Sequence, residues 1–159
     1  MIAVRPFPFQ GEALKQLWQW LQEYPEANFD DYGPKTFAEF CSSIANRSQH
    51  ERMWQVKKDG TPCGVVRYFP VTDRLGSLHG ICFAKGICSR QEKREAVRFV
   101  LAEIFAGGVE KICAGYFADN MKIAKFLSDL GAVREGYFAH HTMRNGQQLD
   151  MVQVAIFKV

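Results

Sequence analysis

The spacing of hydrophobic positions changes several times along the chain, and each change marks a predicted element. Residues 10–23 carry apolar side chains at helical spacing, and residues 92–105 form a second stripe of the same kind. A further helix is expected around residues 37–44, whose apolar members share one face. Residues 120–130 repeat the helical pattern and are followed by Gly131, a residue type that commonly ends helices. The pattern therefore predicts four helices.

Apolar runs with strand-like spacing fill the intervals between these helices. Residues 53–56 and 63–71 flank Asp59-Gly60, a dipeptide typical of a tight β-hairpin. Residues 133–143 and 149–159 flank Asn145-Gly146 in the same way. The other strands are expected over residues 1–5, 77–84 and 111–117.

The predicted order of elements is β-α-α-β-β-β-α-β-α-β-β, with a loop over residues 24–36, which are rich in Pro, Gly, Asp and Asn. This order indicates an α/β (α+β) fold in which a mixed, mostly antiparallel sheet carries helices on both faces. A chain of 159 residues is expected to form a single domain over residues 1–159.

Composition and charge narrow the classes of partner. The chain is 47% hydrophobic and 23% charged, so wholesale disorder is not expected. A net charge of +3 without a basic stripe argues against nucleic acid as a partner. The N-terminus does not resemble a signal peptide, and no apolar stretch is long enough to span a membrane. Five scattered cysteines indicate reduced thiols and a cytoplasmic protein, and no Cys/His spacing predicts a metal site.

The C-terminal half carries motifs of a known family. The segment from Asn120 to Gly131, with Leu130 before the glycine, is similar to the asparagine-to-glycine helix that follows strand five in the GNAT superfamily of N-acetyltransferases. Glu135-Gly136-Tyr137 and Asp150 resemble the closing strands of the branch that acetylates protein N-termini. The order of elements is similar to the same superfamily over most of the chain. The resemblance implies acetyl-CoA as co-substrate and a primary amine as acceptor.

The resemblance places the phosphate-binding loop of coenzyme A before the long helix. Family members have a glycine-containing turn there, whose backbone amides point at the pyrophosphate. Counting back from Glu95-Ala96, this chain has residues 88–94, which contain no glycine, and Gln91 and Lys93 stand where small residues are expected. Either side chains supplement the remaining amides, or the cofactor site has decayed, or these residues are only a solvated helical turn.

The resemblance implies two kinds of contact with the cofactor. Strand four would contribute backbone groups near its end, at Phe83, Ala84 and Lys85. The loop and the later helix would contribute side chains, namely those of Ser89, Arg90, Gln91, Lys93, Arg94 and Asn120. Asn120 could equally be the N-cap of its helix. The tyrosine and the serine that relatives place further along this helix are Leu127 and Ile123 here.

Two residues are candidates for the chemistry of acetyl transfer. His79 is the candidate general base, because it is expected on strand four with the parity of Ile81 and Phe83, and imidazole titrates near neutrality. Tyr116, near the end of strand five, is the candidate acid or substrate contact. Each could instead be structural, as His140-His141 is expected to be, because neighbouring strand residues point to opposite faces.

The acceptor groove is expected around Trp18, Trp20 and residues 26–33, where the family builds it. The acidic residues of this loop, Glu26, Asp30 and Asp31, could attract a cationic amine or could be solvated loop charges. Strand edges near the C-terminus could pair in a homodimer.

Two hypotheses of different classes follow. The first is an acetyl-CoA-dependent N-acetyltransferase acting on a protein N-terminus or a small amine. The alternative is a catalytically degenerate GNAT-fold binding or assembly protein. An open cleft between strands four and five with free amides over residues 91–94 favours the enzyme. A cleft filled by Arg90, Gln91 or phenylalanine side chains favours the alternative.

Overall fold

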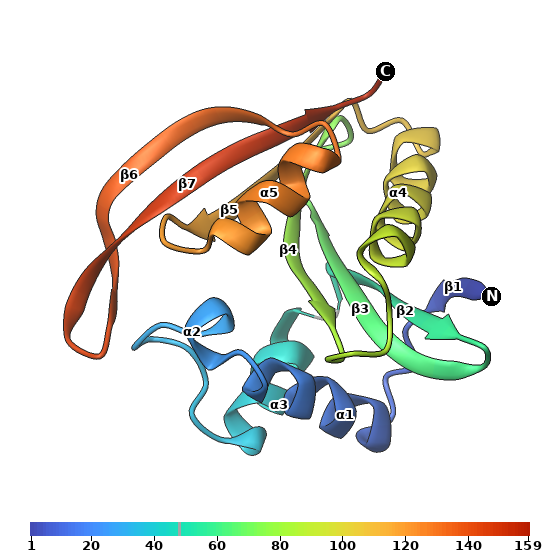
Figure 1. Ribbon diagram of the computed structural model, residues 1–159, viewed down its shortest axis with the longest axis horizontal. Coiled ribbons are helices and arrows are strands. Elements are labelled where there is room, and N and C mark those ends of the chain that lie inside the picture. The colour runs from blue at the N-terminus through green and yellow to red at the C-terminus, as the bar shows by residue number, and fades with distance from the viewer. Residues whose placement is uncertain (48) are drawn as a thin grey trace.

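The computed structural model describes residues 1–47 and 49–159, and its strands form one seven-stranded sheet in the order β1-β2-β3-β4-β5-β7-β6 (Figure 1). The strands are β1 (Ile2–Pro6), β2 (Arg52–Lys58), β3 (Thr61–Pro70), β4 (Leu75–Phe83), β5 (Lys111–Phe117), β6 (Val133–Arg144) and β7 (Gln147–Phe157). The helices are α1 (Gly11–Gln22), α2 (Pro25–Asn28), α3 (Phe37–Arg47), α4 (Arg90–Ala106) and α5 (Met121–Asp129). Every neighbouring pair is antiparallel except β4 and β5.

The predicted fold class and order of elements are confirmed, with two local differences. The predicted loop over residues 24–36 contains the one-turn helix α2, which begins at Pro25, a residue suited to a first helical position. Helix α4 begins two residues earlier than its apolar stripe, because Ser89 caps it. No helix in residues 1–47 or 49–159 is long and apolar enough to cross a membrane.

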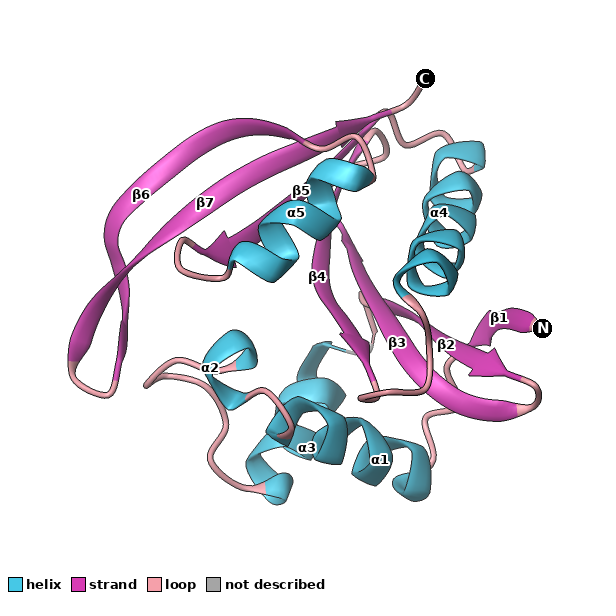
Figure 2. Ribbon diagram, in the orientation of Figure 1, coloured by secondary structure: helices cyan, strands magenta, loops and turns pink. Residues whose placement is uncertain are grey.

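Helices cover both faces of the sheet, and each face has its own apolar core (Figure 2). Helices α4 and α5 pack on one face, through side chains such as Val97 and Leu127 against Val66. Helices α1 and α3 pack on the other, where Leu17 and Phe40 belong to the same cluster as Val65. The alternation of side chains along β3 thus divides consecutive valines between the two cores.

Both predicted hairpins are present, and their turns need left-handed backbone at two consecutive residues. The turn between β2 and β3 has φ of +50° at Asp59 and +84° at Gly60. The turn between β6 and β7 has φ of +52° at Asn145 and +73° at Gly146. Asparagine, aspartate and glycine are the residues that adopt this conformation most readily, which is why the dipeptides predicted the hairpins.

The parallel strands β4 and β5 pair only at their beginnings. Residues Leu75 to Leu78 align with Lys111 to Ala114, and no further pairing of these two strands is found in the described chain. Past this point β4 stays with β3, and β5 stays with β7 as far as Phe117. The sheet therefore splits between its two central strands, which diverge in Figure 1 from a shared end.

A β-bulge at His79 changes which face that residue occupies. Tyr68 of β3 pairs with Leu78, while Arg67 pairs with Gly80, so His79 is the extra residue. Leu78 and Ile81, three positions apart, consequently face the same core. The expectation that His79 shares the face of Ile81 and Phe83 is wrong, because the bulge shifts the alternation and His79 stacks on Phe69 instead.

The close approach of Gly76 to Tyr68 gives a test of this packing. A Cβ atom at Gly76 would lie 2.1 Å from the ring of Tyr68, which is 1% exposed and cannot move aside. Gly76→Ala is expected to lower the free energy of unfolding by about 1–3 kcal/mol, measured by urea denaturation. Gly80→Ala on the same strand is the control, since its Cβ would meet only Arg67 Cδ at 3.5 Å. Equal losses in both variants would contradict the packing described.

Candidate active site

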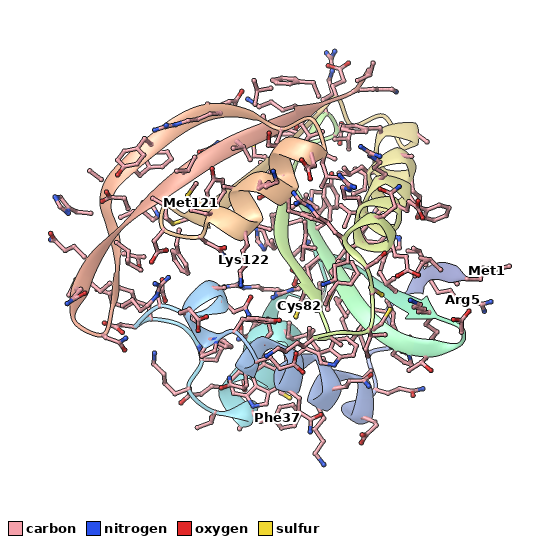
Figure 3. The ribbon with its side chains drawn as sticks, in the orientation of Figure 1. Met1, Arg5, Phe37, Cys82, Met121 and Lys122 are labelled. Atoms are coloured by element: carbon pink, nitrogen blue, oxygen red, sulfur yellow. The ribbon has the colours of Figure 1, made fainter. Side chains whose placement is uncertain are left out.

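A cleft of about 940 Å³ opens where β4 and β5 separate. Its walls come from β4, β5 and α5 together with α1, α3 and the segment around α2. Lys122 of α5 and Cys82 of β4, both labelled in Figure 3, line it. The cleft therefore reaches residues of both helical layers through the split in the sheet.

One end of the cleft lies beside the start of α4, and two predicted cofactor residues line it there. The Phe83 ring lies against Gly64, where a Cβ would be 2.4 Å from the ring. Lys93 Nζ is 5.6 Å from the centre of the same ring. Apolar side chains of α5 complete this end, namely Ile123, Phe126 and Leu127.

Asn120 is confirmed as the N-cap of its helix, and it also lies at the cleft. Its side-chain oxygen accepts a hydrogen bond from the amide of Ile123 at 3.2 Å, so it is the N-cap of α5. The same residue lines the cleft. The cap fixes the position of the asparagine at the start of α5.

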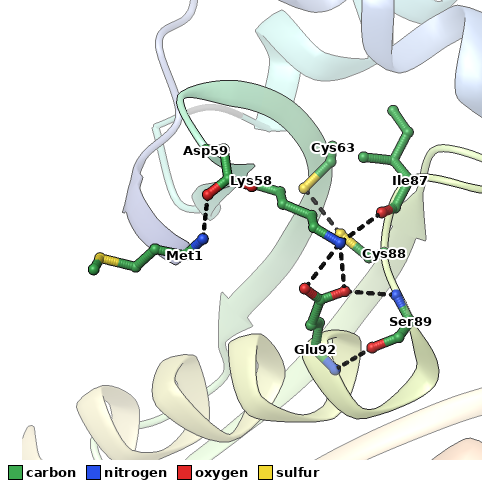
Figure 4. Close-up of polar contacts among 8 residues, drawn as sticks. All are labelled: Met1, Lys58, Asp59, Cys63, Ile87, Cys88, Ser89 and Glu92. Atoms are coloured by element: carbon green, nitrogen blue, oxygen red, sulfur yellow. Dashed lines mark hydrogen bonds and ion pairs between the residues drawn. The ribbon is translucent and has the colours of Figure 1, made fainter.

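The first turn of α4 is closed by the protein's own side chains (Figure 4). Ser89 Oγ accepts from the amide of Glu92 at 3.2 Å, and Glu92 Oε2 accepts from the amide of Ser89 at 2.8 Å. Lys58 Nζ lies 2.9 Å from Glu92 Oε1 and 3.0 Å from Oε2. The hydrogen bond from the Ser89 amide, with Lys58, lowers the pKa of Glu92 to about 2. A carboxylate thus lies where the family places a phosphate-binding turn.

The arginines predicted for this site point to α5. Arg90 and Arg94 both form ion pairs with Asp129, Arg94 at 3.2 Å. Arg94 also donates to Gln91 Oε1 at 2.8 Å, and Gln91 donates to Glu95 at 2.7 Å. These contacts join the beginning of α4 to the end of α5. The cleft is therefore open, because neither Arg90 nor Gln91 fills it, although phenylalanine rings line its walls.

Three other predicted cofactor residues do not line the cleft with their side chains. Ala84 is buried in the core beneath α1 and α3. The amide of Lys85 donates to Glu23 Oε2 at 2.9 Å, which ties the end of β4 to the end of α1. Ser89 is engaged in the cap of α4.

The other end of the cleft contains a charged cluster around His79. The His79 ring stacks on Phe69 with ring centres 5.3 Å apart, and His79 Nδ1 is 3.7 Å from Glu51 Oε1. Glu51 is buried and accepts two hydrogen bonds from Arg67, at 2.9 and 3.0 Å. Desolvation lowers the pKa of His79 below its ordinary value, and the cations of Arg67 and Arg47 act in the same direction, while Glu51 opposes them. The lowered pKa favours the neutral form of the imidazole.

Tyr116 reaches the same cleft from the opposite face. Its side chain packs against the core formed with α4 and α5 and also lines the cleft. His79 stacks on Phe69, on the face of α1 and α3. The two candidate catalytic residues are thus brought to one cleft by the split in the sheet, and not by sharing a face.

Sequence reasoning missed Glu51, Arg67 and Arg47. Arg67 had a usable signal, because it is a lone charge inside the apolar run 65–69 and such charges are rarely buried without a partner. Glu51 and Arg47 gave none, since charges between elements are common. No group of three or more His, Cys, Asp and Glu that could hold a metal ion is found in residues 1–47 and 49–159.

The loop predicted for the acceptor groove lines the cleft, but Trp18 and Trp20 of α1, predicted for the same groove, do not. Trp20 is buried, and Trp18 packs on Phe29 and Phe40. The lining residues of this segment include Asn28, Phe29, Asp30, Tyr32, Gly33 and Pro34. Glu26 is exposed and lies outside the lining.

The aspartates of this loop bind the tip of the β6–β7 hairpin. Asp31 accepts from the amides of Asn145 and Gly146 at 2.8 and 2.9 Å, and these bonds lower its pKa. Asp30 accepts from Thr142 Oγ1 at 2.6 Å. The hairpin tip and the loop therefore form one wall beside the cleft.

The β6–β7 hairpin contains a bulge at His140-His141, which was not predicted from the sequence. Phe138 pairs with Met151 and Thr142 with Leu149, so β6 has extra residues there, and His140 has a φ of +53°. The amide of His140 donates to Asp150 Oδ1 at 2.7 Å. The expectation that these two histidines follow the regular alternation of a strand is thus wrong. Neither of them lines the main cleft.

Comparison with known proteins identifies a family. The model of the acetyltransferase (GNAT) family matches residues 14–132. No curated protein matches the chain.

Several solved structures share the fold at low sequence identity. A ribosomal-protein-alanine N-acetyltransferase from Brucella melitensis is 15% identical with a TM-score of 0.77, and the match covers 98% of this chain and 99% of that one. A spermidine N-acetyltransferase from Vibrio cholerae, in complex with CoA and spermine, is 17% identical with a TM-score of 0.79, covering 98% and 95%. An N-acetyltransferase from Staphylococcus aureus Mu50 is 14% identical with a TM-score of 0.78, covering 99% and 98%.

The cap of α4 predicts a pH-dependent contribution to stability. Because the pKa of Glu92 is about 2 in the folded protein against an ordinary 4.5, its contribution is complete above pH 4.5 and is lost as the pH falls towards 2. Glu92→Gln keeps an acceptor for Ser89 but removes the ion pair with Lys58. The variant is expected to have a lower free energy of unfolding than the parent at pH 6. This difference is expected to shrink below pH 4.5.

Urea denaturation at several pH values from 6 downwards measures this difference in the free energy of unfolding. Glu95→Gln is the matched control, because the Glu95 carboxylate accepts a hydrogen bond from the neutral amide of Gln91 and forms no ion pair within residues 1–47 and 49–159. A difference for Glu92→Gln that does not change with pH would contradict the ion pair.

Proposed function

Because the chain belongs to the acetyltransferase (GNAT) family, we propose that it transfers an acetyl group from acetyl-CoA to a primary amine, either a protein N-terminus or a small molecule. The observation that carries the proposal is the open cleft at the split between β4 and β5. Strand edges that lack a partner offer amides and carbonyls to a ligand, as they do in strand addition. Acetyl-CoA would supply the activated acetyl thioester.

Side chains fit the phosphates of acetyl-CoA better than the helix start does. The Glu92 amide is already bonded to Ser89 Oγ, and the Lys93 amide is bonded to the Ser89 carbonyl, at 3.1 Å. The basic groups of Arg90, Lys93 and Arg94 lie on this turn, and charge-assisted bonds to phosphate are strong. We therefore assign Lys93 and Asn120, which line the cleft with Phe83, to contact the cofactor. Arg90 and Arg94, which pair with Asp129 outside the lining, are assigned to supply positive charge near its phosphates.

The other end of the cleft would receive the amine. A neutral His79 can accept the proton that the amine must lose before it attacks the thioester. Glu51, close to Nδ1, would favour the tautomer that leaves Nε2 free as the acceptor. Tyr116 is assigned to contact the substrate or to donate a proton to the leaving thiolate.

One observation favours the alternative, a GNAT-fold binding protein without catalysis. Glu92 supplies a negative charge at the start of α4, and its partner Lys58 is already paired. An anionic ligand would have to lie beside this carboxylate. The acetyltransferase and the binding protein differ in whether acetyl-CoA binds at all.

We also propose a cytoplasmic location. All five cysteines are free thiols. Cys88 Sγ donates a hydrogen bond to Cys63 Sγ at 3.2 Å, and burial raises the pKa of Cys63 to about 12. A reducing compartment would keep this close pair as thiols.

Calorimetric titration with acetyl-CoA tests the cofactor assignment. The parent protein is expected to bind, and Lys93→Gln is expected to raise the Kd about tenfold, the loss of one charge-assisted contact. Arg98→Gln is the control on the same helix, because Arg98 donates to the Asp129 carbonyl and does not line the cleft. Absence of heat at near-millimolar acetyl-CoA would favour the binding protein instead.

The role of His79 is tested by the pH dependence of acetyl transfer. His79→Ala is expected to lower kcat/KM about 100-fold or more. Since the pKa of His79 is lowered, the parent should lose activity only below about pH 6.5, as the imidazole becomes protonated, and the variant should lack this acidic limb. His50→Ala is the control, because His50 contacts the same Phe69 but lies outside the cleft. An unchanged acidic limb in His79→Ala would rule out the assignment.

A further inference from the structure

The end of the cleft around His79 has an excess of positive charge. Arg47 and Arg67 both line it, next to His79. Glu51 is the carboxylate paired with Arg67, and its side chain is only 1% exposed. One buried anion thus faces two cations, so this end of the cleft attracts anions and repels polycations.

Arg67 is held in place with donors to spare. Its Nε and Nη2 bind the two oxygens of Glu51, at 2.9 and 3.0 Å. A guanidinium has five N–H donors, and this arrangement uses one on Nε and one on Nη2. The remaining donors belong to a side chain that is 16% exposed and lines the cleft. A fixed guanidinium loses little entropy when it binds an anionic group.

Arg47 adds a second cation from another element. It lies in the last turn of α3 and lines the cleft. Among residues 1–47 and 49–159, no carboxylate lies within 4.0 Å of its guanidinium. Its charge is close enough to lower the pKa of His79, together with Arg67. Two arginines from α3 and β3 therefore converge on the place assigned to the acceptor.

The carboxylates that line the cleft are already engaged in holding the loop after α2. Glu39 Oε2 accepts from the amides of Lys35 and Thr36, at 2.6 and 3.3 Å. Asp30 accepts from the Tyr32 amide at 3.0 Å and from Thr142. These bonds hold both carboxylates in the wall of the cleft. Within residues 1–47 and 49–159, neither carboxylate forms an ion pair with Arg47 or Arg67.

The wall also limits the size of the acceptor. The amide of Asp31 donates to the Met143 carbonyl at 2.7 Å, and its carboxylate binds the turn of the hairpin. In Figure 1 the loop after α2 reaches towards the tip of the β6–β7 hairpin. A wall held together on this side suits a small molecule better than a polypeptide.

Resting on the proposed function, we infer that the acceptor is a small amine that also carries a carboxylate or phosphate group, which Arg67 and Arg47 bind while the amino group lies beside His79. This class differs from that of the polyamines, whose cationic chains would face two arginines. The selectivity comes from the arginine charges near the base, and not from the base itself.

Acetylation of matched amines tests the inference. The parent protein is assayed with 4-aminobutanoate against 4-aminobutanamide, with phosphoethanolamine against ethanolamine, and with spermidine. At least one anionic amine is expected to exceed its neutral counterpart about tenfold or more in kcat/KM, the effect of one charge-assisted contact, and spermidine is expected to be the poorest. The first pair reports on a carboxylate and the second on a phosphate.

Variants distinguish the contribution of the two arginines in the cleft from the effect of losing a positive charge elsewhere on the protein. Arg47→Gln, on the surface of α3, should reduce the preference for the anionic amine over its neutral counterpart to about threefold or less. Glu51→Gln combined with Arg67→Gln removes the other cation without leaving a buried charge unpaired. Arg5→Gln on β1 makes the same change of charge outside the cleft and should keep the full preference.

The outcomes distinguish a failure of the anionic-acceptor inference from a failure of the proposed acetyltransferase function. Equal rates within both pairs, or a preference for spermidine, would overturn the inference while leaving the acetyltransferase intact. An unchanged preference in Arg47→Gln and in the double variant would also overturn it. If no amine is acetylated and no acetyl-CoA binds, the proposed function fails and the inference falls with it.

Discussion

Four residue pairs at the start of β4 and β5 hold the two halves of the sheet together, and the site depends on their pairing ending there. If the two parallel strands continued side by side, they would close the sheet and fill the space that the cleft occupies. Their outer partners prevent this, because β3 and β7 each follow one of the two strands past the split. The twist that all sheets have then increases the separation along the strands. The cleft is thus a consequence of topology more than of any single side chain.

The same split determines which residues can meet. Tyr116 and His79 belong to opposite faces, and they reach one space only because the sheet is open between them. The bulge at His79 is the second requirement, since without it the imidazole would point towards α4 and away from Glu51. The two ends of the cleft then differ in character. One has basic side chains on the first turn of α4, and the other has a buried ion pair that fixes an arginine.

Much of the fold was predictable from local patterns, and the least predictable features were those made by pairs of distant residues. Asp59-Gly60 and Asn145-Gly146 predicted their hairpins because few residues adopt left-handed backbone. The face of His79 was not predictable, because a bulge depends on the register of two strands. The carboxylate of Glu92 at the start of α4 could have been expected, since Ser89 and Glu92 have the spacing of a capping box. Glu51 could not, because nothing near it in the sequence indicates Arg67 as its partner.

The central claim is that the split between β4 and β5 is where acetyl-CoA binds, and a crystal structure of the protein grown with saturating acetyl-CoA tests it most directly. The account predicts density for the pantetheine chain between the two strands, with the phosphates next to Arg90, Lys93 and Arg94. Density elsewhere on the protein, or an empty cleft under these conditions, would contradict it.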